Sequence, residues 1–153
     1  AMNPSALISM SESRLAQLVR PAGYFRQKAK KLKIFSKWLL KEWGGDFSRM
    51  KRVPLPELRR RLLSVWGIGP ETADSILLYA LGKPSFVIDA YTKRLCDCLG
   101  IAFKDYHEYQ KFFTSNLPKG VKLYNEYHAL IVAWGKVLRQ DPARARKLVS
   151  RWL

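Results

Sequence analysis

The stretch "LLSVWGIGPETADSILLYALGKPSFVIDAYTKR", residues 62–94, decides the fold. Two glycines flank Ile68 inside a helical apolar pattern, which predicts a helix, a tight turn and a second helix over residues 58–81. Twenty residues after the second glycine, Asp89 follows an apolar run and opens another helix. The run "SFVI" has no second strand to pair with, so we expect a buried connector there.

The apolar spacing is helical along almost the whole chain. We predict helices over residues 11–20, 24–43, from Pro56 to about 65, 70–81, 90–99, 105–116, about 121–138 and 143–152. The expected fold class is therefore all-α, with about seven to nine helices and short connections. We expect one domain over residues 1–153, with a helical core over about 21–118 and C-terminal helices over about 119–153.

The charge is unusually positive for a chain of 153 residues, with 28 Lys and Arg against 12 Asp and Glu. A net charge of +16 favours a polyanionic partner, nucleic acid above all, over a surface that is merely solubilising. No apolar run approaches the ~20 residues of a membrane span, and the first residues do not resemble a secretory signal. The two cysteines, Cys96 and Cys98, lie two positions apart in a predicted helix and cannot form a disulfide framework.

The glycine turn is a candidate anion site. The backbone amides of residues 69–72 lie at a helix N-terminus, where the helix dipole favours negative charge. Both glycines can adopt positive φ or allow another backbone to approach closely. An ordinary αα-hairpin is the structural alternative, but together with the charge the pattern favours contact with phosphate regardless of base sequence.

The quoted stretch resembles the helix-hairpin-helix and Gly/Pro/Asp signature of the endonuclease III superfamily (HhH-GPD) of DNA base-excision glycosylases. The resemblance extends upstream through "VRPAGYFRQKAKKLKIFSKWLL" and downstream through "YNEYHALIVAWGK", and so covers roughly residues 12–138. Within the superfamily, the chain looks most similar to the bacterial 3-methyladenine DNA glycosylases that lack an iron–sulfur cluster. The resemblance implies the helix-hairpin-helix DNA glycosylase fold.

The resemblance places the family's catalytic aspartate on Asp89, in "VIDAYTKR". Breaking an N-glycosidic bond builds positive charge on the deoxyribose, and a fixed carboxylate stabilises that charge and can orient a water molecule. The structural alternative is that Asp89 only caps its helix. The two roles are compatible, because a helix N-terminus favours the ionised carboxylate.

A second position bears on the type of reaction. Family members that also cut the strand carry a Schiff-base lysine two residues after the second glycine, and here that position is Glu71. A glutamate cannot form a Schiff base, so the resemblance implies a monofunctional glycosylase, although Lys83 and Lys93 lie nearby in sequence. The C-terminal segment "WGKVLRQDPARARKLVSRWL" has no cysteine, so we expect no iron–sulfur cluster and no required cofactor.

The resemblance also implies the residues that contact DNA. The expected set is Gly67, Ile68, Gly69, Pro70, Glu71, Thr72 and Lys93. In related enzymes the hairpin binds a monovalent or divalent cation through backbone carbonyls, which here would be those of Leu63, Val65 and Ile68.

Four further positions are candidates for a role in the site. His128, in "NEYHALIV", could shuttle a proton, but a packing role is favoured because water attack assisted by Asp89 does not require it. Tyr24, Phe25 and Trp66 are candidates to stack on a flipped, alkylated purine. Most aromatic residues are expected in the core.

Family members carry further helices before the segment that matches residues 12–40, so we expect either an N-terminally truncated form or a protein that has lost that half of the site. The expected function is a monofunctional base-excision-repair DNA glycosylase acting on an alkylated purine such as 3-methyladenine. The alternatives are a mismatch- or uracil-type glycosylase and a non-catalytic helix-hairpin-helix DNA-binding module. We expect double-stranded DNA with a damaged base as the partner, a monomer, and the cytoplasm of a bacterium or archaeon, at the nucleoid.

Overall fold

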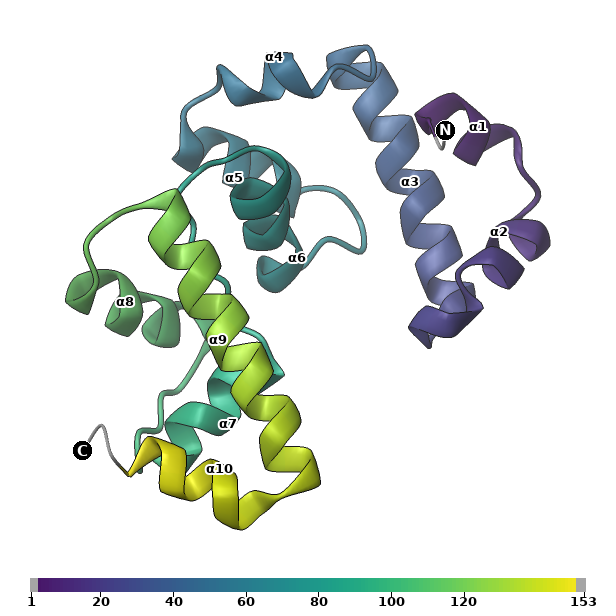
Figure 1. Ribbon diagram of the computed structural model, residues 1–153. Coiled ribbons are helices and arrows are strands. Elements are labelled where there is room, and N and C mark those ends of the chain that lie inside the picture. The colour runs from purple at the N-terminus through teal and green to yellow at the C-terminus, as the bar shows by residue number, and fades with distance from the viewer. Residues whose placement is uncertain (1–2, 151–153) are drawn as a thin grey trace. The chain divides into compact units, whose positions relative to one another are not determined.

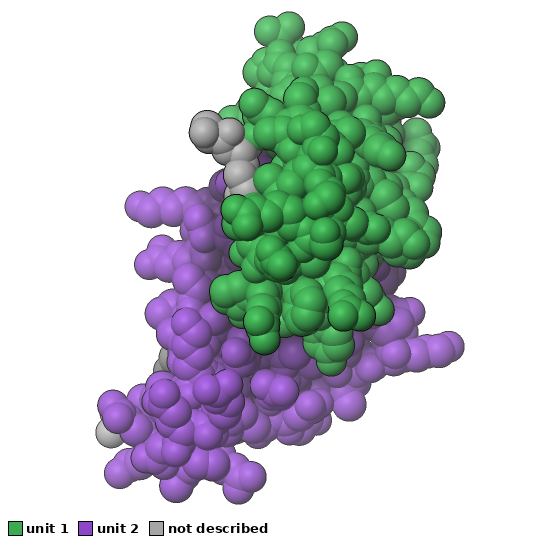
Figure 2. Space-filling model, turned by 90° about the vertical axis from the view of Figure 1, so that its right-hand side faces the viewer, with its two compact units in different colours: residues 1–69 green, residues 70–153 purple. Residues whose placement is uncertain are grey.

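The computed structural model describes residues 3–150, and these residues form helices and no strand, which confirms the all-α class (Figure 1). The chain divides into two compact units, Ala1–Gly69 and Pro70–Leu153, coloured separately in Figure 2. Each unit is described by itself. In the described part of the chain, none of the helices combines the length and the apolarity that crossing a membrane requires.

Helix α3 (Phe25–Trp43) is the central element of the first unit (Figure 1). It packs against α1 (Pro4–Ser9) and α2 (Glu12–Leu18), and Leu15 and Ala29 are fully buried in this contact. Helix α3 follows the short 3₁₀ turn η1 (Arg20–Ala22). It ends at Gly44, whose φ of 63° suits the left-handed conformation of a helix C-terminus and is the end expected from the paired glycines.

Two short helices of this unit, α1 and α4 (Phe47–Lys51), were not expected from the sequence. They span six and five residues, which is too short to display a helical period. Side chains at their first residues support them instead, because the oxygen of Asn3 accepts from the amide of Ala6 and that of Asp46 from the amide of Ser48. Helix α5 (Leu55–Leu63) then leads into the glycine turn.

The turn of the hairpin depends on the first of its two glycines. Gly67 has a φ of +85°, and a Cβ atom built there would lie 2.7 Å from Cγ of Lys31. Gly69 does not have a positive φ, and a Cβ there would meet nothing within 4 Å. Of the two uses expected of these glycines, positive φ is confirmed at Gly67 and is not found at Gly69, which borders open space.

The second unit is built around helix α9 (Val121–Gln140), which packs against several other elements of the unit (Figure 1). Its helices are α6 (Pro70–Ser75), the π-helical segment η2 (Ile76–Ala80), α7 (Ala90–Cys98), α8 (Tyr106–Asn116), α9 and α10 (Pro142–Val149). Gly135 allows α7 and α9 to approach closely, because a Cβ atom there would lie 2.2 Å from Cδ1 of Tyr91. The predicted helix at 143–152 is seen as α10, and residues 151–152 lie outside the described residues.

The segment between η2 and α7 crosses the core of this unit without regular structure, as expected for "SFVI". Phe86, Val87 and Ile88 are at most 1% exposed. The ring of Phe86 stacks on Phe113 with 4.5 Å between centroids and meets Tyr124 edge-on at 5.3 Å. Core packing therefore fixes the segment, here called the connector (residues 82–88), immediately before Asp89.

Candidate active site

Asp89 stands at the junction between the connector and helix α7. Its Oδ1 atom accepts two hydrogen bonds from Thr92, one from the backbone amide at 2.8 Å and one from the hydroxyl at 3.0 Å. The predicted capping role of Asp89 is thus confirmed. The carboxylate side chain is only 15% exposed, so it is held at a helix N-terminus in a largely desolvated position.

Helix α9 brings His128 to the other side of this carboxylate. The distance from Nε2 of His128 to Oδ2 of Asp89 is 3.4 Å, and the histidine side chain is 10% exposed. Nε2 is buried and makes no hydrogen bond, so the carboxylate of Asp89 is the polar group that it faces. The expectation that His128 is a packing residue is therefore incomplete: it is buried against the core, but it also faces the aspartate.

Tyr79 contacts His128 from the opposite side of the imidazole, through a hydrogen bond between its hydroxyl and Nδ1. Tyr79 belongs to η2, where the amide of Leu81 bonds to the carbonyl of Ile76, five residues back, at 3.1 Å. This wider turn rotates the side chains that follow relative to an α-helix, and such segments are frequent at functional sites. Tyr79 is 48% exposed, so the chain of contacts runs from the surface to Asp89.

The surroundings of Asp89 favour its charged form. Burial acts to raise the pKa of Asp89, but the contact with His128 and the hydrogen bonds from Thr92 outweigh burial and hold the pKa below its ordinary value. Burial, and secondarily the charge of Asp89, raise the pKa of Tyr79. At neutral pH the site therefore contains a carboxylate and a protonated phenol.

A second carboxylate, Asp74 on α6, organises the polar groups beneath the site. It is fully buried, and its Oδ1 accepts from the hydroxyl of Ser85 at 2.6 Å. Its Oδ2 accepts from the hydroxyl of Tyr106 at 2.8 Å and from the side-chain amide of Gln110 at 3.0 Å. The carboxylate thus joins three elements, namely α6, the connector and α8.

The same partners bind the backbone of the connector. The hydroxyl of Tyr106 accepts from the amide of Ile88 at 3.2 Å, and the side-chain amide of Gln110 donates to the carbonyl of Phe86 at 2.7 Å. Buried backbone groups without partners are costly, so these bonds supply what a strand or helix would otherwise provide. The backbone just before Asp89 is thereby fixed by side chains.

The hairpin residues expected to bind DNA lie in the sequence on either side of Gly69, the last residue of the first unit. Gly69, Pro70, Glu71 and Thr72 are exposed, and Pro70 has no amide proton, which leaves the amides of residues 69, 71 and 72 as donors. The carbonyl of Val65 accepts from the amide of Ile68 at 3.0 Å within the turn. Residues 67–69 close the first unit, whereas Glu71 and Thr72 share the second unit with Asp89.

The expected cation site on the carbonyls of Leu63, Val65 and Ile68 remains a prediction. Within residues 3–150, no three His, Cys, Asp or Glu side chains gather closely enough to hold a metal ion.

The two cysteines on α7 differ in exposure, since Cys96 is buried and Cys98 is exposed. Burial, followed by the charge of Asp97, raises the pKa of the Cys96 thiol to about 11.

Lys93, also expected to contact DNA, is exposed on α7, four residues after Asp89. Its ammonium group lies 5.8 Å from the ring centroid of Tyr109. The lysine therefore extends along the surface of the second unit, on the helix that begins at Asp89.

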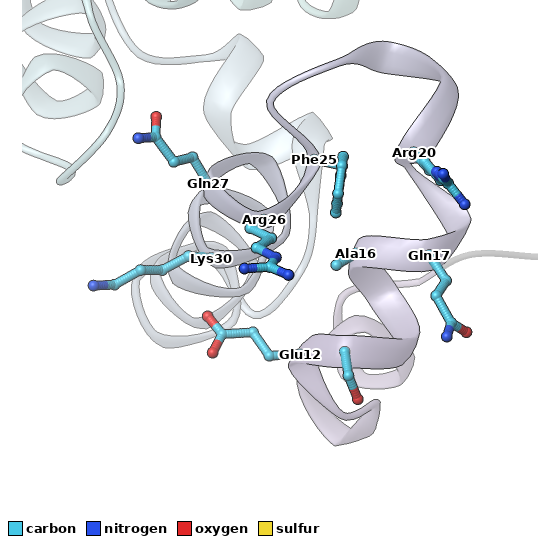
Figure 3. Close-up of a pocket in the computed structure, with 9 residues that line it drawn as sticks. Glu12, Ala16, Gln17, Arg20, Phe25, Arg26, Gln27 and Lys30 are labelled. Atoms are coloured by element: carbon cyan, nitrogen blue, oxygen red, sulfur yellow. The ribbon is translucent and has the colours of Figure 1, made fainter.

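The first unit contains the three aromatic residues considered for base stacking. Phe25 lines a cavity of about 660 Å³ between α2 and α3, and its ring faces Ala16 while Arg20, Arg26 and Lys30 carry the positive charge of the rim (Figure 3). Tyr24 is 84% exposed and has a φ of 45°. The ring of Trp66 is covered by the ammonium group of Lys30 at 4.8 Å. Their stacking role stays a prediction.

Sequence reasoning did not find Tyr79, Asp74, Tyr106 or Gln110. One local signal is present for Asp74, which is an acid between the apolar positions Ala73 and Leu77, both of which are buried. Tyr79, Tyr106 and Gln110 lie within helical patterns that are equally compatible with a surface position and a core position. Their partners are 18 to 49 residues away in sequence, so no local spacing reveals them.

Residues 1–119 match the model of the HhH-GPD superfamily base excision DNA repair proteins. A provisionally named DNA repair glycosylase of Methanocaldococcus jannaschii is 45% identical over 130 residues, which are 82% of this chain and 59% of the relative.

Two solved structures are also similar. The Helicobacter pylori 3-methyladenine DNA glycosylase bound to 1,N6-ethenoadenine superposes with a TM-score of 0.75 and 33% identity, over 87% of this chain and 66% of that one. A trapped covalent intermediate of endonuclease III with DNA gives a TM-score of 0.63 and 25% identity, over 76% of this chain and 52% of that one. The chain thus spans about half to two thirds of the length of these proteins.

The Asp74 cluster generates a prediction about stability. Asp74→Asn keeps the shape but replaces one acceptor oxygen by an NH₂ donor, which would face the donating groups of Ser85 or of Tyr106 and Gln110. We expect the free energy of unfolding to fall by about 1–3 kcal/mol, the cost of leaving buried polar groups unsatisfied. Urea denaturation measures it, and Asp97→Asn, at an exposed site on α7, is the control. An Asp74→Asn protein as stable as the control would contradict the role given to this cluster.

Proposed function

The chain belongs to the HhH-GPD superfamily of base excision DNA repair proteins, and from this premise we propose that it is a DNA glycosylase in which Asp89 is the catalytic carboxylate. The observation that carries the proposal is the geometry of Asp89, which is ionised, 15% exposed and fixed at the start of α7. A side chain that only capped its helix would need neither the buried histidine nor the hydrogen-bonded connector that hold it here.

The chemistry assigned to Asp89 is electrostatic. As the bond between base and sugar lengthens, positive charge develops on the deoxyribose, and a carboxylate already in place stabilises that charge without reorganising. The positive end of the α7 dipole and the Thr92 hydrogen bonds keep the carboxylate ionised before the reaction begins. Water then attacks the anomeric carbon, and the products are a free base and an abasic site.

The proposed substrate is an alkylated purine such as 3-methyladenine in double-stranded DNA. Support comes from the likeness to the H. pylori 3-methyladenine DNA glycosylase, which extends over most of this chain. A base that already carries positive charge leaves readily, so a carboxylate that stabilises the charge on the sugar suits this class of substrate.

The proposed reaction is monofunctional. Glu71 occupies the position of the Schiff-base lysine, at the exposed start of α6. A carboxylate cannot attack the sugar to form an imine, and its charge would oppose a phosphate placed close to it. In this proposal the strand is left uncut.

We propose that DNA is held through its phosphates. The amides of Gly69, Glu71 and Thr72 are on exposed residues at the start of a helix, where an anion is favoured. The first unit is the more basic of the two, because 15 of the 28 Lys and Arg residues but only 4 of the 12 acidic residues precede Pro70. Such contacts position the duplex and carry no base specificity.

The first prediction tests the role of Asp89. Asp89→Asn should reduce single-turnover excision of 3-methyladenine by about 100-fold or more, because the charge that stabilises the transition state is lost. Asparagine also caps helices, so the fold should be retained. DNA affinity should be unchanged or higher, since a negative charge near phosphate is removed.

The matched control is Asp97→Asn, which removes the same charge from an exposed site on α7 and should excise like the wild type. Excision by Asp89→Asn at the rate of this control would refute the catalytic role. A wild-type chain that binds DNA but excises no base would favour the alternative of a DNA-binding module.

The second prediction concerns Glu71. Borohydride reduction during the reaction traps any Schiff base as a covalent protein–DNA adduct. We expect no adduct with the wild-type chain on duplex containing the damaged base. An adduct resolved by denaturing electrophoresis would show that another amine attacks the sugar, and the monofunctional assignment would then be wrong.

The third prediction uses the two glycines of the turn as a matched pair. Gly69→Val should leave the fold intact, because residue 69 borders open space without a positive φ, but its side chain should block an approaching phosphate. Affinity for unrelated duplexes should fall alike, and the wild-type log–log salt slope should be about −4 to −5 if ~5 phosphates are neutralised. Gly67→Val should instead destabilise the fold, since φ there is +85°.

Fluorescence anisotropy titrations on two duplexes, with circular dichroism to monitor folding, distinguish these effects. A folded Gly69→Val protein that binds like the wild type, or a flat salt dependence, would exclude the hairpin as the DNA anchor.

A further inference from the structure

The two oxygens of Asp89 have different surroundings. A carboxylate oxygen offers two lone pairs, and both of those on Oδ1 are used by the amide and hydroxyl of Thr92. Oδ2 accepts from neither group of Thr92 and faces Nε2 of His128 at 3.4 Å. Only Oδ2 is therefore available to a substrate atom or a water molecule, and its direction depends on what His128 presents to it.

The hydrogen bond from Tyr79 bears on what His128 presents. A neutral imidazole carries one proton, and the other nitrogen is an acceptor. If the proton were on Nδ1, the lone pair of Nε2 would face the carboxylate, and two acceptors would oppose each other in a buried place. If the phenol donates to Nδ1, the proton is on Nε2 and points toward Oδ2. Only a donating phenol leaves the single proton of a neutral imidazole on Nε2, where it faces the buried carboxylate.

We propose that Tyr79 and His128 are positioning residues for Asp89: the tyrosine hydroxyl fixes the neutral Nε2–H tautomer of His128, and this N–H holds Oδ2 so that its remaining lone pair is directed at the reacting sugar. The reference to the sugar rests on the proposed glycosylase function. The arrangement of the three side chains rests on their contacts alone.

The order of burial fits this role. Asp89 and His128 are 15% and 10% exposed, whereas Tyr79 is 48% exposed. The inner donor thus works in a desolvated place, where a hydrogen bond to a charged group is strong. The tyrosine reaches the imidazole from the π-helical segment η2, and such segments are frequent at functional sites.

Nuclear magnetic resonance of the ¹⁵N-labelled chain reads the tautomer directly. At neutral pH, long-range proton–nitrogen correlations should show a protonated Nε2 and an unprotonated Nδ1 for His128. The other histidine of the chain, His107, is exposed on α8 and serves as the internal reference. Tyr79→Phe should convert His128 to a mixture of tautomers, and Asp89→Asn should weaken the preference for Nε2–H.

A protonated Nδ1 in the wild type, an imidazolium at neutral pH, or a pattern that Tyr79→Phe leaves unchanged would each overturn the proposal. These outcomes are independent of any enzyme assay.

Single-turnover excision tests the consequence for the reaction. We expect a fall of about tenfold for Tyr79→Phe and about 100-fold for His128→Leu, the size of effect that misplacing a reacting group produces. His128→Gln should recover part of the loss, because its amide can donate to Oδ2. DNA affinity should not change in any of these variants. The control is Tyr109→Phe, which removes a hydroxyl from the aromatic core beside Phe103.

The experiments distinguish a failure of the positioning role from a failure of the proposed glycosylase function. If Asp89→Asn abolishes excision but His128→Leu excises like the wild type, the positioning role is wrong and the proposed function stands. If the wild type excises nothing while the tautomer is as expected, the proposed function is wrong and the arrangement of Tyr79, His128 and Asp89 stands.

Discussion

The second unit depends on one constraint, which is that an irregular segment crosses its core and must still have its backbone polar groups bonded. The connector buries Phe86, Val87 and Ile88 almost completely. In a helix or a sheet, other backbone groups would bond to the amides and carbonyls of such a segment. Here the side chains of Tyr106 and Gln110, both on α8, bond to the connector backbone. The buried carboxylate of Asp74 accepts hydrogen bonds from both of these side chains. The position of Asp89, one residue further along, is a result of this arrangement.

A side chain on a flexible loop would not be positioned as precisely as Asp89 is here. A reacting group held within a fraction of an ångström needs neighbours whose own conformations are fixed. Asp89 has such neighbours on each side, with the connector before it, Thr92 one turn later in α7, and His128 from α9. Helices α7 and α9 pack closely at Gly135, which fixes the position of Thr92 relative to His128. The site is therefore built from long-range packing, although its central residue was found from a short motif.

This explains which parts could be predicted from sequence. Helix limits followed from local signals, such as the glycines after Trp43 and the aspartate before Ala90, and the all-α class followed from the apolar period. The connector was predicted because a lone apolar run cannot form a sheet. The short helices α1 and α4 were missed because a helix of five or six residues shows no period. The contacts of His128 and Asp74 were missed because the partners come from separate helices, and no spacing within one helix encodes them.

The turn shows a similar limit at the scale of a single residue. Two glycines in "GIG" look equivalent in the sequence, yet Gly67 serves the backbone and Gly69 leaves space beside it. Backbone dihedrals distinguish them, and composition does not.

The unequal exposure of the two thiols has a practical consequence. Cys98 is exposed on α7, whereas Cys96 is buried, with a thiol pKa raised to about 11. Because the thiolate is the reactive form, an alkylating dye at neutral pH should attach to Cys98 and leave Cys96 unmodified. The chain thus carries a natural attachment point for a fluorophore on the very helix that begins at Asp89. Changes in the surroundings of that helix could then be followed by fluorescence in the unaltered sequence.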